Sequence, residues 1–183
     1  MSEEHVNGAN GEVEVGNFET RSYAEEFVVF ARDSRFFAMS TEVVSEVIEW
    51  RQPTRVPQSP AILTGVLNLR GQMLSVIACD SLLGGTESQA TEKDAILVTR
   101  YESTLLGLIV DRVQEVSQIP TSDVHSNPLE VARPHYRGLW HNPSRNALVT
   151  ILDGRRLIEE AFSAFAQESK NREINVPTIG ESP

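Results

Sequence analysis

Short apolar runs alternate with polar turns between about residues 26 and 152, which is typical of strands rather than long helices. Residues 27–30 and 36–39 are apolar and flank a polar segment, so they predict a hairpin. Residues 41–50 are rich in β-branched side chains, which favours one turn at Thr41 followed by a strand. The other predicted elements are a helical turn at 61–64, strands at 65–70 and 72–78, a short helix at 80–83 and a helix at 155–167.

The heptapeptide Gly-Val-Leu-Asn-Leu-Arg-Gly that ends at Gly71 is the most distinctive part of the sequence. Strand alternation places Leu67 and Leu69 on one face and Asn68 and Arg70 on the other, with a turn at the final glycine. An arginine at the rim of a turn presents five N–H donors in a rigid fork. Such a fork suits a carboxylate or the carbonyl groups of a partner protein.

The second half of the sequence repeats the pattern of the first half. Two copies are too few for a solenoid, but each copy has about five short strands, enough for a small closed barrel. Barrel closure would also remove the exposed edges of these strands. The aligned segments are 27–30 with 95–98, 36–39 with 105–110, 44–47 with 113–116, 55–57 with 118–120, 65–68 with 138–141, and 73–78 with 147–152.

These patterns predict an all-β fold with a few short helices, in which two similar five-stranded barrels pack together before a C-terminal helix. The barrels are expected at about residues 27–84 and 95–165, within one domain at 25–168. Residues 1–24 are expected to be a disordered acidic tail, and residues 169–183 a polar tail.

The net charge of −10 argues against nucleic acid or an anionic membrane as the main partner. Seven acidic residues and one arginine lie in residues 1–26, so this segment is solubilising or is an acidic docking segment for a basic partner. No apolar run reaches the length of a membrane span, and no secretory signal is visible. Cys79 is the only cysteine, which excludes an intramolecular disulfide and favours a reducing cytoplasm.

No catalytic, cofactor or metal site is predicted, because no serine elbow, phosphate loop or cysteine pair is present. Trp50 beside Arg51 and Arg55 could stack on a base next to phosphates, but the acidic charge argues against that function. Asp111 is expected to stabilise a turn, and Cys79 to be a small buried apolar residue. The histidines outside the N-terminal segment lack metal-ligand spacing: His125, His135 and His141.

The order of these motifs resembles the CheW family of chemotaxis coupling proteins. The likeness extends from about residue 25 to residue 162, and its strongest elements are Gly-Val-Leu-Asn-Leu-Arg-Gly at 65–71 and Gly-Leu-Ile-Val-Asp-Arg-Val at 107–113. The sequence departs from the family pattern at 75–80, where it has Ser-Val-Ile-Ala-Cys-Asp. A cysteine in this segment occurs in some relatives that work with type IV pili.

The resemblance implies two SH3-like barrels and a non-catalytic, cytoplasmic scaffold without a cofactor. Such adaptors link the cytoplasmic tips of chemoreceptors (methyl-accepting chemotaxis proteins) to the regulatory domain of a CheA-type histidine kinase, in arrays that control chemotaxis or surface motility. They are recruited to membrane receptors without entering the membrane. By position, Arg70 matches the family's arginine and Glu46 the acid that pairs with it. The resemblance also assigns partner contacts to Val44, Ile48, Gly65, Leu67, Asn68 and Gly71.

The repeat supports Arg70 independently of the family. The turn sequence Asn-Pro-Ser-Arg at 142–145 occupies the position of 68–71 in the second copy, and it lacks the Leu-Arg-Gly tip. A feature found in one copy only is a better candidate for binding than one that both barrels need. Three alternatives remain: Arg70 only holds Glu46 and orders its turn, the chain is a detached regulatory module of another signalling protein, or it is a barrel enzyme or metal protein with an unrecognised site.

Overall fold

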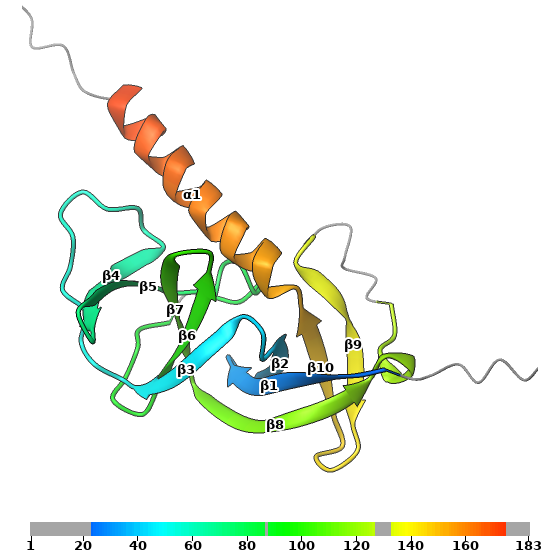
Figure 1. Cartoon of the computed structure of the whole chain (residues 1–183). Helices are drawn as coiled ribbons and strands as arrows, with labels where there is room; N and C mark the ends of the chain where they lie inside the picture. Colours follow the sequence, from blue (N-terminus) through cyan, green and yellow to red (C-terminus); the bar gives the residue numbers. More distant parts are fainter. Residues whose placement is uncertain (1–22, 87, 127–132, 175–183) are drawn as a thin grey trace, which may run out of the picture.

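The ten expected strands and the C-terminal helix are present in the computed structural model (Figure 1), which describes residues 23–86, 88–126 and 133–174, with side chains as far as Gln167. The strands are β1 Ala24–Arg32, β2 Arg35–Ser40, β3 Val44–Glu49, β4 Leu63–Leu69, β5 Gln72–Ile77, β6 Ala95–Tyr101, β7 Thr104–Val110, β8 Arg112–Pro120, β9 Tyr136–Asn142 and β10 Ala147–Leu152. Helix α1 spans Gly154–Ile174, and a short 3-10 turn spans Thr121–Asp123. The predicted hairpin is confirmed, because β1 pairs with β2 from Phe27 opposite Ser40 to Arg32 opposite Arg35.

The strands form two five-stranded sheets of identical design. Sheet A has the order β8-β1-β2-β10-β9, and sheet B has the order β3-β6-β7-β5-β4. If β1 to β5 are matched with β6 to β10 in sequence, the two orders become the same. Each sheet contains one parallel pair, β2 with β10 or β5 with β7. The internal repeat inferred from the sequence is therefore a repeat of sheet architecture.

The expected boundaries of the two barrels, 27–84 and 95–165, do not match the sheets and are corrected by the strand order. Sheet A takes its first two strands from the first copy and the other three from the second, and sheet B has the reverse arrangement. The copies have thus exchanged their N-terminal hairpins. Periodicity could not reveal this exchange, because the apolar pattern of a strand is the same whichever copy completes its sheet.

The core consists of a central cluster and one smaller cluster in each sheet. The central cluster combines residues from both sheets with the inner face of α1, where Leu157, Ile158 and Ala161 are buried. The cluster of sheet B includes Ile48, Leu69, Leu74, Val76, Ile96, Val98, Leu105 and Ile109, and that of sheet A includes Phe27, Val29, Ala38, Ile119, Trp140, Val149 and Ile151. The central cluster joins the sheets into one unit.

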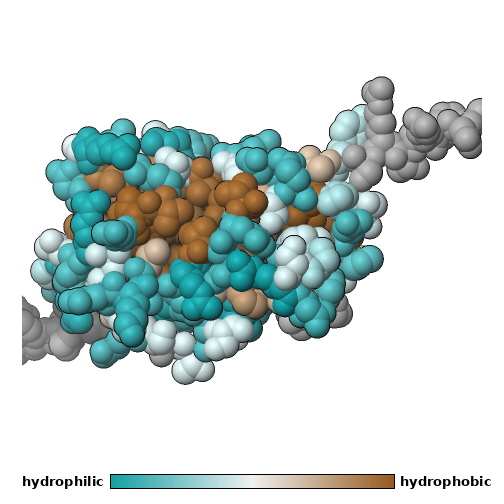
Figure 2. Space-filling model, turned by 90° about the horizontal axis from the view of Figure 1, so that it is seen from below, coloured by the Kyte–Doolittle hydropathy of each residue, from teal (hydrophilic) through white to brown (hydrophobic). Residues whose placement is uncertain are grey.

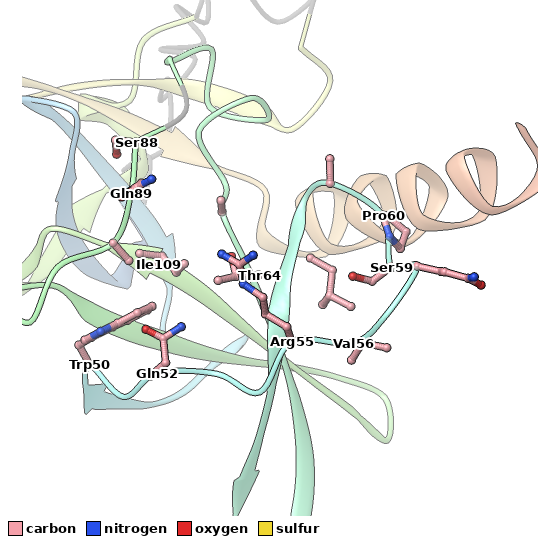
Figure 3. Close-up of a pocket in the computed structure, with 15 residues that line it drawn as sticks. Trp50, Gln52, Arg55, Val56, Ser59, Pro60, Thr64, Ser88, Gln89 and Ile109 are labelled. Carbon is pink, nitrogen blue, oxygen red and sulfur yellow. The ribbon is translucent and has the colours of Figure 1, made fainter. Parts of the chain in front are cut away.

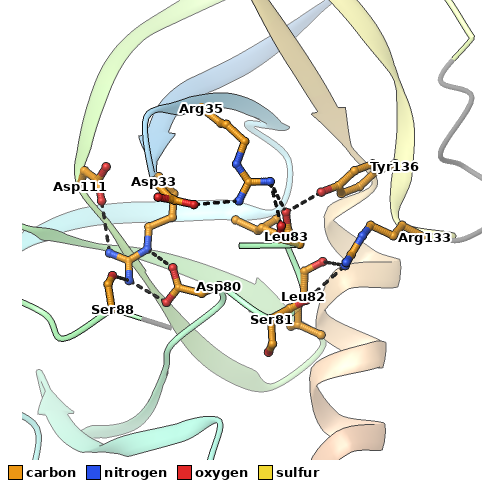
Figure 4. Close-up of polar contacts among 12 residues, drawn as sticks. Asp33, Arg35, Asp80, Ser81, Leu82, Leu83, Ser88, Asp111, Arg133 and Tyr136 are labelled. Atoms are coloured by element: carbon orange, nitrogen blue, oxygen red, sulfur yellow. Dashed lines mark hydrogen bonds and ion pairs between the residues drawn. The ribbon is translucent and has the colours of Figure 1, made fainter. Parts of the chain in front are cut away.

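A buried ion pair reinforces the junction between the sheets (Figure 4). Arg32 at the end of β1 donates from Nε and Nη2 to the two carboxylate oxygens of Asp80, at 2.6 and 2.7 Å, and from Nη1 to Asp111 at 3.2 Å. Burial alone would lower the pKa of Arg32, but the hydrogen bonds and charge of Asp80 raise it above its ordinary value. Asp111 was expected to stabilise a turn, but its carboxylate instead pairs with Arg32.

The turn that follows Asp80 is held by side chains from sheet A and the loop before β9 (Figure 4). Arg35 donates to the carbonyl oxygen of Leu83, Arg133 donates to that of Leu82, and the Tyr136 hydroxyl also donates to that of Leu83. The segment is a hydrogen-bonded turn rather than the short helix predicted at 80–83, and Gly84 ends it with φ +68°. The carbonyl groups of Leu82 and Leu83 accept hydrogen bonds from these side chains, where a continuing helix would supply backbone N–H groups.

Helix α1 is longer than the prediction of 155–167 and includes the first residues of the expected polar tail. Asp153 caps its N-terminus, because Oδ1 accepts hydrogen bonds from the backbone N–H groups of Arg155 and Arg156. Residues 168–174 contain neither glycine nor proline, so nothing in them stops the helix. The predicted helical turn at 61–64 is shorter than expected, since β4 begins at Leu63.

The tail predictions for residues 1–22 and 175–183 lie outside the described residues. None of the described helical segments is long and apolar enough to span a membrane.

Candidate functional site

Arg70 stands at the tip of the β4–β5 hairpin in an unfavourable backbone conformation. Arg70 and Gly71 have φ angles of +52° and +85°, which correspond to a two-residue turn of the primed type. Asn or Asp normally precedes the glycine in such a turn, and a residue with a bulky side chain in the left-handed region costs about 1 kcal/mol or more. The Oδ1 atom of Asn68 accepts a hydrogen bond of 2.8 Å from the N–H of Gly71 and so supports the turn.

The Arg70 side chain pairs with Glu46, as the family resemblance implied. Nη2 of Arg70 lies 3.0 Å from Oε2 of Glu46, and the two side chains are 80 % and 27 % exposed. Glu46 is on β3 and Arg70 follows β4, the two edge strands of sheet B, so the pair links the edges of that sheet. Among the described residues only Nη2 is engaged, which leaves most of the guanidinium donors directed to solvent.

Several of the other predicted contact residues are structural, and of them only Ile48 lines a hollow together with Glu46 and Arg70. Val44 and Leu67 are partly buried against core clusters, and Ile48 is 9 % exposed within the core of sheet B. Gly65 is buried where a bridge joins Thr54 to the next residue of β4, and a Cβ atom on it would lie 2.5 Å from the Thr54 carbonyl oxygen. Because they are buried or partly buried, these residues support the backbone of the site and offer little surface to a partner. A hollow of ≈520 Å³ beside them is lined by Glu46, Val47, Ile48, Glu49, Trp50, Arg51, Leu69 and Arg70.

Sheet A contains a counterpart of the Arg70–Glu46 pair, which sequence comparison missed. Glu115 follows a bulge in β8, just as Glu46 follows a bulge in β3, and they are opposite Val29 and Val98. These two residues are equivalent when the hairpins are matched by their turns, which pairs 27–30 with 96–99 and corrects the sequence alignment with 95–98 by one residue. Oε1 of Glu115 lies 3.5 Å from Nε of Arg145, on the β9–β10 hairpin, and accepts a hydrogen bond from Asn142. The β9–β10 loop has four residues, 143–146, whereas the β4–β5 turn has two, 70–71. The two arginines therefore do not fall at the same position when the sequences of the two copies are aligned.

This counterpart corrects the argument that Arg70 is unusual because the second copy lacks it. In both sheets an arginine on a hairpin forms an ion pair with a glutamate on an edge strand. This hairpin-to-edge ion pair is therefore part of the shared architecture. Arg145 has a 36 % exposed side chain, against 80 % for Arg70. What distinguishes Arg70 from Arg145 is therefore its exposure and its left-handed backbone, a conformation that other turn residues of the chain, such as Gln58 and Glu102, also adopt.

An apolar band crosses the face of the molecule opposite α1 (Figure 2). Strands β3 and β8 run along this side in Figure 1, and each has one exposed valine, Val47 (43 % exposed) and Val116 (58 %). These two valines occupy equivalent positions, one residue after Glu46 and Glu115. Met73 and Leu148, on β5 and β10, are also exposed and are equivalent in the repeat. Sequence analysis missed these residues, although a valine that breaks strand alternation is a visible signal.

A second hollow, of ≈660 Å³, lies between residues 50–64 and the loop at 88–90 (Figure 3). Trp50 and Gln52 lie on one side of it, Ser88 and Gln89 on another, and Arg55 near its centre. Among the described residues that line it, Arg55 alone is charged, and none of them is a predicted contact residue. It therefore has little of the chemistry expected of an active site.

The remaining candidate groups have separate surroundings. Cys79 is fully buried, as predicted, and burial raises the pKa of its thiol to about 12. His125 forms a backbone bridge with Leu139, and His141 contacts Asn146. His135 is buried against α1. Within the described ranges, no three histidine, cysteine or acidic side chains are grouped to hold a metal ion.

A family model described as "CheW-like domain" matches residues 26–162. The chain belongs to the CheW family. It is 28 % identical over 143 residues to "Chemotaxis protein CheW" of Bacillus subtilis, covering 78 % of this chain and 92 % of that protein. "Protein PilI" of Pseudomonas aeruginosa is 30 % identical over 115 residues, covering 61 % of this chain and 65 % of PilI.

The fold agrees with this family. The crystal structure of scaffolding protein TtCheW from Thermoanaerobacter tengcongensis superposes with a TM-score of 0.64 at 22 % identity, covering 76 % of this chain and 90 % of that chain. The prediction of a CheW-like fold with two five-stranded units and a C-terminal helix is therefore confirmed.

Proposed function

We propose that this chain is a non-catalytic adaptor of the cytoplasm that couples chemoreceptors to a CheA-type histidine kinase within receptor arrays. Membership of the CheW family supports this role. The observation that carries the proposal is Arg70, an exposed arginine held in a strained turn beside a hollow between edge strands. Its unused donors suit an acidic side chain or a helix C-terminus of a receptor tip.

The apolar band provides the second component of the docking surface. Exposed apolar area on a soluble domain commonly marks a site that a partner covers. Val47 and Arg70 both line the hollow of ≈520 Å³, so an apolar helix that contacted Val47 could reach Arg70 at the same time. The band lies on the face opposite α1, and a partner could approach it without displacing that helix (Figures 1 and 2).

The kinase would dock on the ends of the sheets, separately from the receptor. Val44, Ile48, Gly65 and Leu67 would then act mainly by shaping the receptor-facing edge, because their side chains are wholly or partly buried. Glu46 would orient Arg70 through the ion pair. Asn68 and Gly71 would fix the turn that displays it.

The decisive experiment compares Arg70→Glu with Arg145→Glu in a reconstituted mixture of receptor, kinase and adaptor. Each substitution breaks one hairpin-to-edge ion pair, so the two variants are matched in architecture. Arg70→Glu should lower receptor binding at least tenfold and abolish receptor-dependent kinase activation, whereas Arg145→Glu should leave both near wild type. Circular dichroism would check that both variants remain folded. Normal coupling by folded Arg70→Glu protein would refute the assignment of the site.

A further inference from the structure

His135 connects three separate elements through a completely buried imidazole ring. Its Nδ1 atom lies 2.6 Å from Oε2 of Glu160 on α1, and its Nε2 atom lies 2.9 Å from the carbonyl oxygen of Leu82, in the turn after β5. The backbone carbonyl of His135 also accepts a hydrogen bond from the N–H of Asp153, just before α1. One side chain therefore joins the start of β9, the junction turn and the C-terminal helix.

Both ring nitrogens of His135 face groups that accept hydrogen bonds. A neutral imidazole has one N–H donor and one lone pair, so it can satisfy only one of these acceptors. The imidazolium form has two N–H donors and satisfies both. A neutral ring would place its lone pair against either the Glu160 carboxylate or the Leu82 carbonyl at hydrogen-bond distance, which is repulsive.

The charged groups around this ring make Glu160 the balancing partner. Arg133, on the same loop, donates to the Leu82 carbonyl at 2.6 Å, and Arg35 of β2 donates to the neighbouring Leu83 carbonyl at 2.7 Å. Arg156 of α1 donates to the carbonyl of Pro134 at 3.2 Å and lies 3.5 Å from the Asp153 carboxylate. Because three arginines contact these segments, a positive charge on His135 depends on the carboxylate of Glu160.

We propose that the proton on His135 is a pH-dependent latch that holds α1 against the junction between the two sheets. The latch is closed when the imidazole is charged and opens as it loses its proton. The helix carries Leu157, Ile158 and Ala161 into the central cluster, so a loosened α1 would let water reach the part of the core that both sheets share. This inference is independent of the proposed receptor coupling.

Nuclear magnetic resonance of the ¹⁵N-labelled full chain tests the latch directly. Imidazole ¹⁵N shifts distinguish the charged ring from each neutral tautomer, and amide exchange reports the opening of α1. We expect His135 to be charged wherever α1 is closed, and protection factors in residues 157–161 to fall at least tenfold as it loses its proton. A neutral His135 beneath a closed α1, or protection factors that do not change when the ring loses its proton, would overturn the proposal.

Two variants separate the latch from a general effect of pH. Glu160→Gln retains an oxygen acceptor for Nδ1 but removes the balancing charge, so the loss of the His135 proton and the opening of α1 should both move to lower pH. His141→Gln, on the exposed β9–β10 hairpin, is the matched control and should leave both curves unchanged. An unchanged midpoint in folded Glu160→Gln protein would also refute the latch. This variant keeps the test available if His135→Gln does not fold.

Discussion

Arg32 and Asp80 form a two-point ion pair that is inaccessible to solvent and joins the end of β1 in sheet A to the turn after β5 in sheet B. Replacing Asp80 leaves the buried Arg32 charge with only the partly exposed Asp111, 3.2 Å from Nη1, as an ion-pair partner. Asp80→Asn should therefore lower the free energy of unfolding by about 3–5 kcal/mol, as measured by urea denaturation. Asp33→Asn is the matched control, because Asp33 is exposed and 3.6 Å from Arg35. It should cost less than about 1 kcal/mol, and equal losses would contradict a special role for the buried pair.

Replacing Arg70 by asparagine should separate stability from function. Asn-Gly is the preferred sequence for this type of turn, so Arg70→Asn relieves the unfavourable backbone of an arginine with φ +52°. The exposed ion pair that is lost contributes at most about 1 kcal/mol. The variant should unfold at the same or a slightly higher temperature than the wild type, while receptor binding falls at least tenfold. A marked loss of thermal stability would show that the ion pair, rather than turn strain, dominates at this hairpin.

Gly65 and Gly138 should be equally sensitive to a methyl group. Each lies beside an isolated bridge, Thr54 with Val66 and His125 with Leu139, and a Cβ atom on either would come within 2.5 Å of a neighbouring atom. At Gly65 that neighbour is a backbone carbonyl oxygen, so Gly65→Ala should cost at least about 2 kcal/mol of unfolding free energy. Gly138→Ala first meets a valine methyl and then a carbonyl oxygen at 2.9 Å, so a similar loss is expected. Denaturation midpoints would check both, and a neutral Gly65→Ala would contradict the close approach of Thr54.

The buried thiol of Cys79 should make the protein less stable in alkali. Burial raises the pKa of this thiol from 9.0 to about 12, so the unfolded chain loses the proton first as the pH rises. Between these values the unfolded state binds fewer protons than the folded state, and the free energy of unfolding should fall by up to about 1.4 kcal/mol per pH unit. Urea denaturation of wild type and Cys79→Ala between pH 8 and 10.5 would isolate this effect, since the tyrosines titrate in both proteins. Parallel pH profiles would contradict it.

The same burial predicts that Cys79 reacts slowly with thiol reagents. Its sulfur is inaccessible, and its Sγ donates to the carbonyl oxygen of Ile109 at 3.3 Å. Ellman's reagent should react with Cys79 only as fast as the protein opens, and at the full rate in denaturant. Rapid reaction in the native state would show that the junction opens far more readily than its packing indicates.

Local pattern predicted most of the strands, because each depends on alternation within a few residues. The pairing of Glu46 with Arg70 followed from the family resemblance, since the two lie 24 residues apart and on different strands. Its counterpart, Glu115 with Arg145, was missed because the β9–β10 loop is two residues longer than the β4–β5 turn. The role of Arg32 was also missed: in sequence it is a polar residue next to a turn, and only the packing of two sheets buries it.

The exchange of N-terminal hairpins has a consequence for how this protein unfolds. Neither copy of the repeat contains the five strands of one sheet, so the loss of β1 and β2 opens sheet A while the remaining strands of the first copy stay in sheet B. Cutting the chain between the copies would give two fragments, neither of which could complete a sheet alone. Sheet A and sheet B should therefore melt in one transition, and surfaces on opposite sheets should keep a constant separation until the whole molecule unfolds.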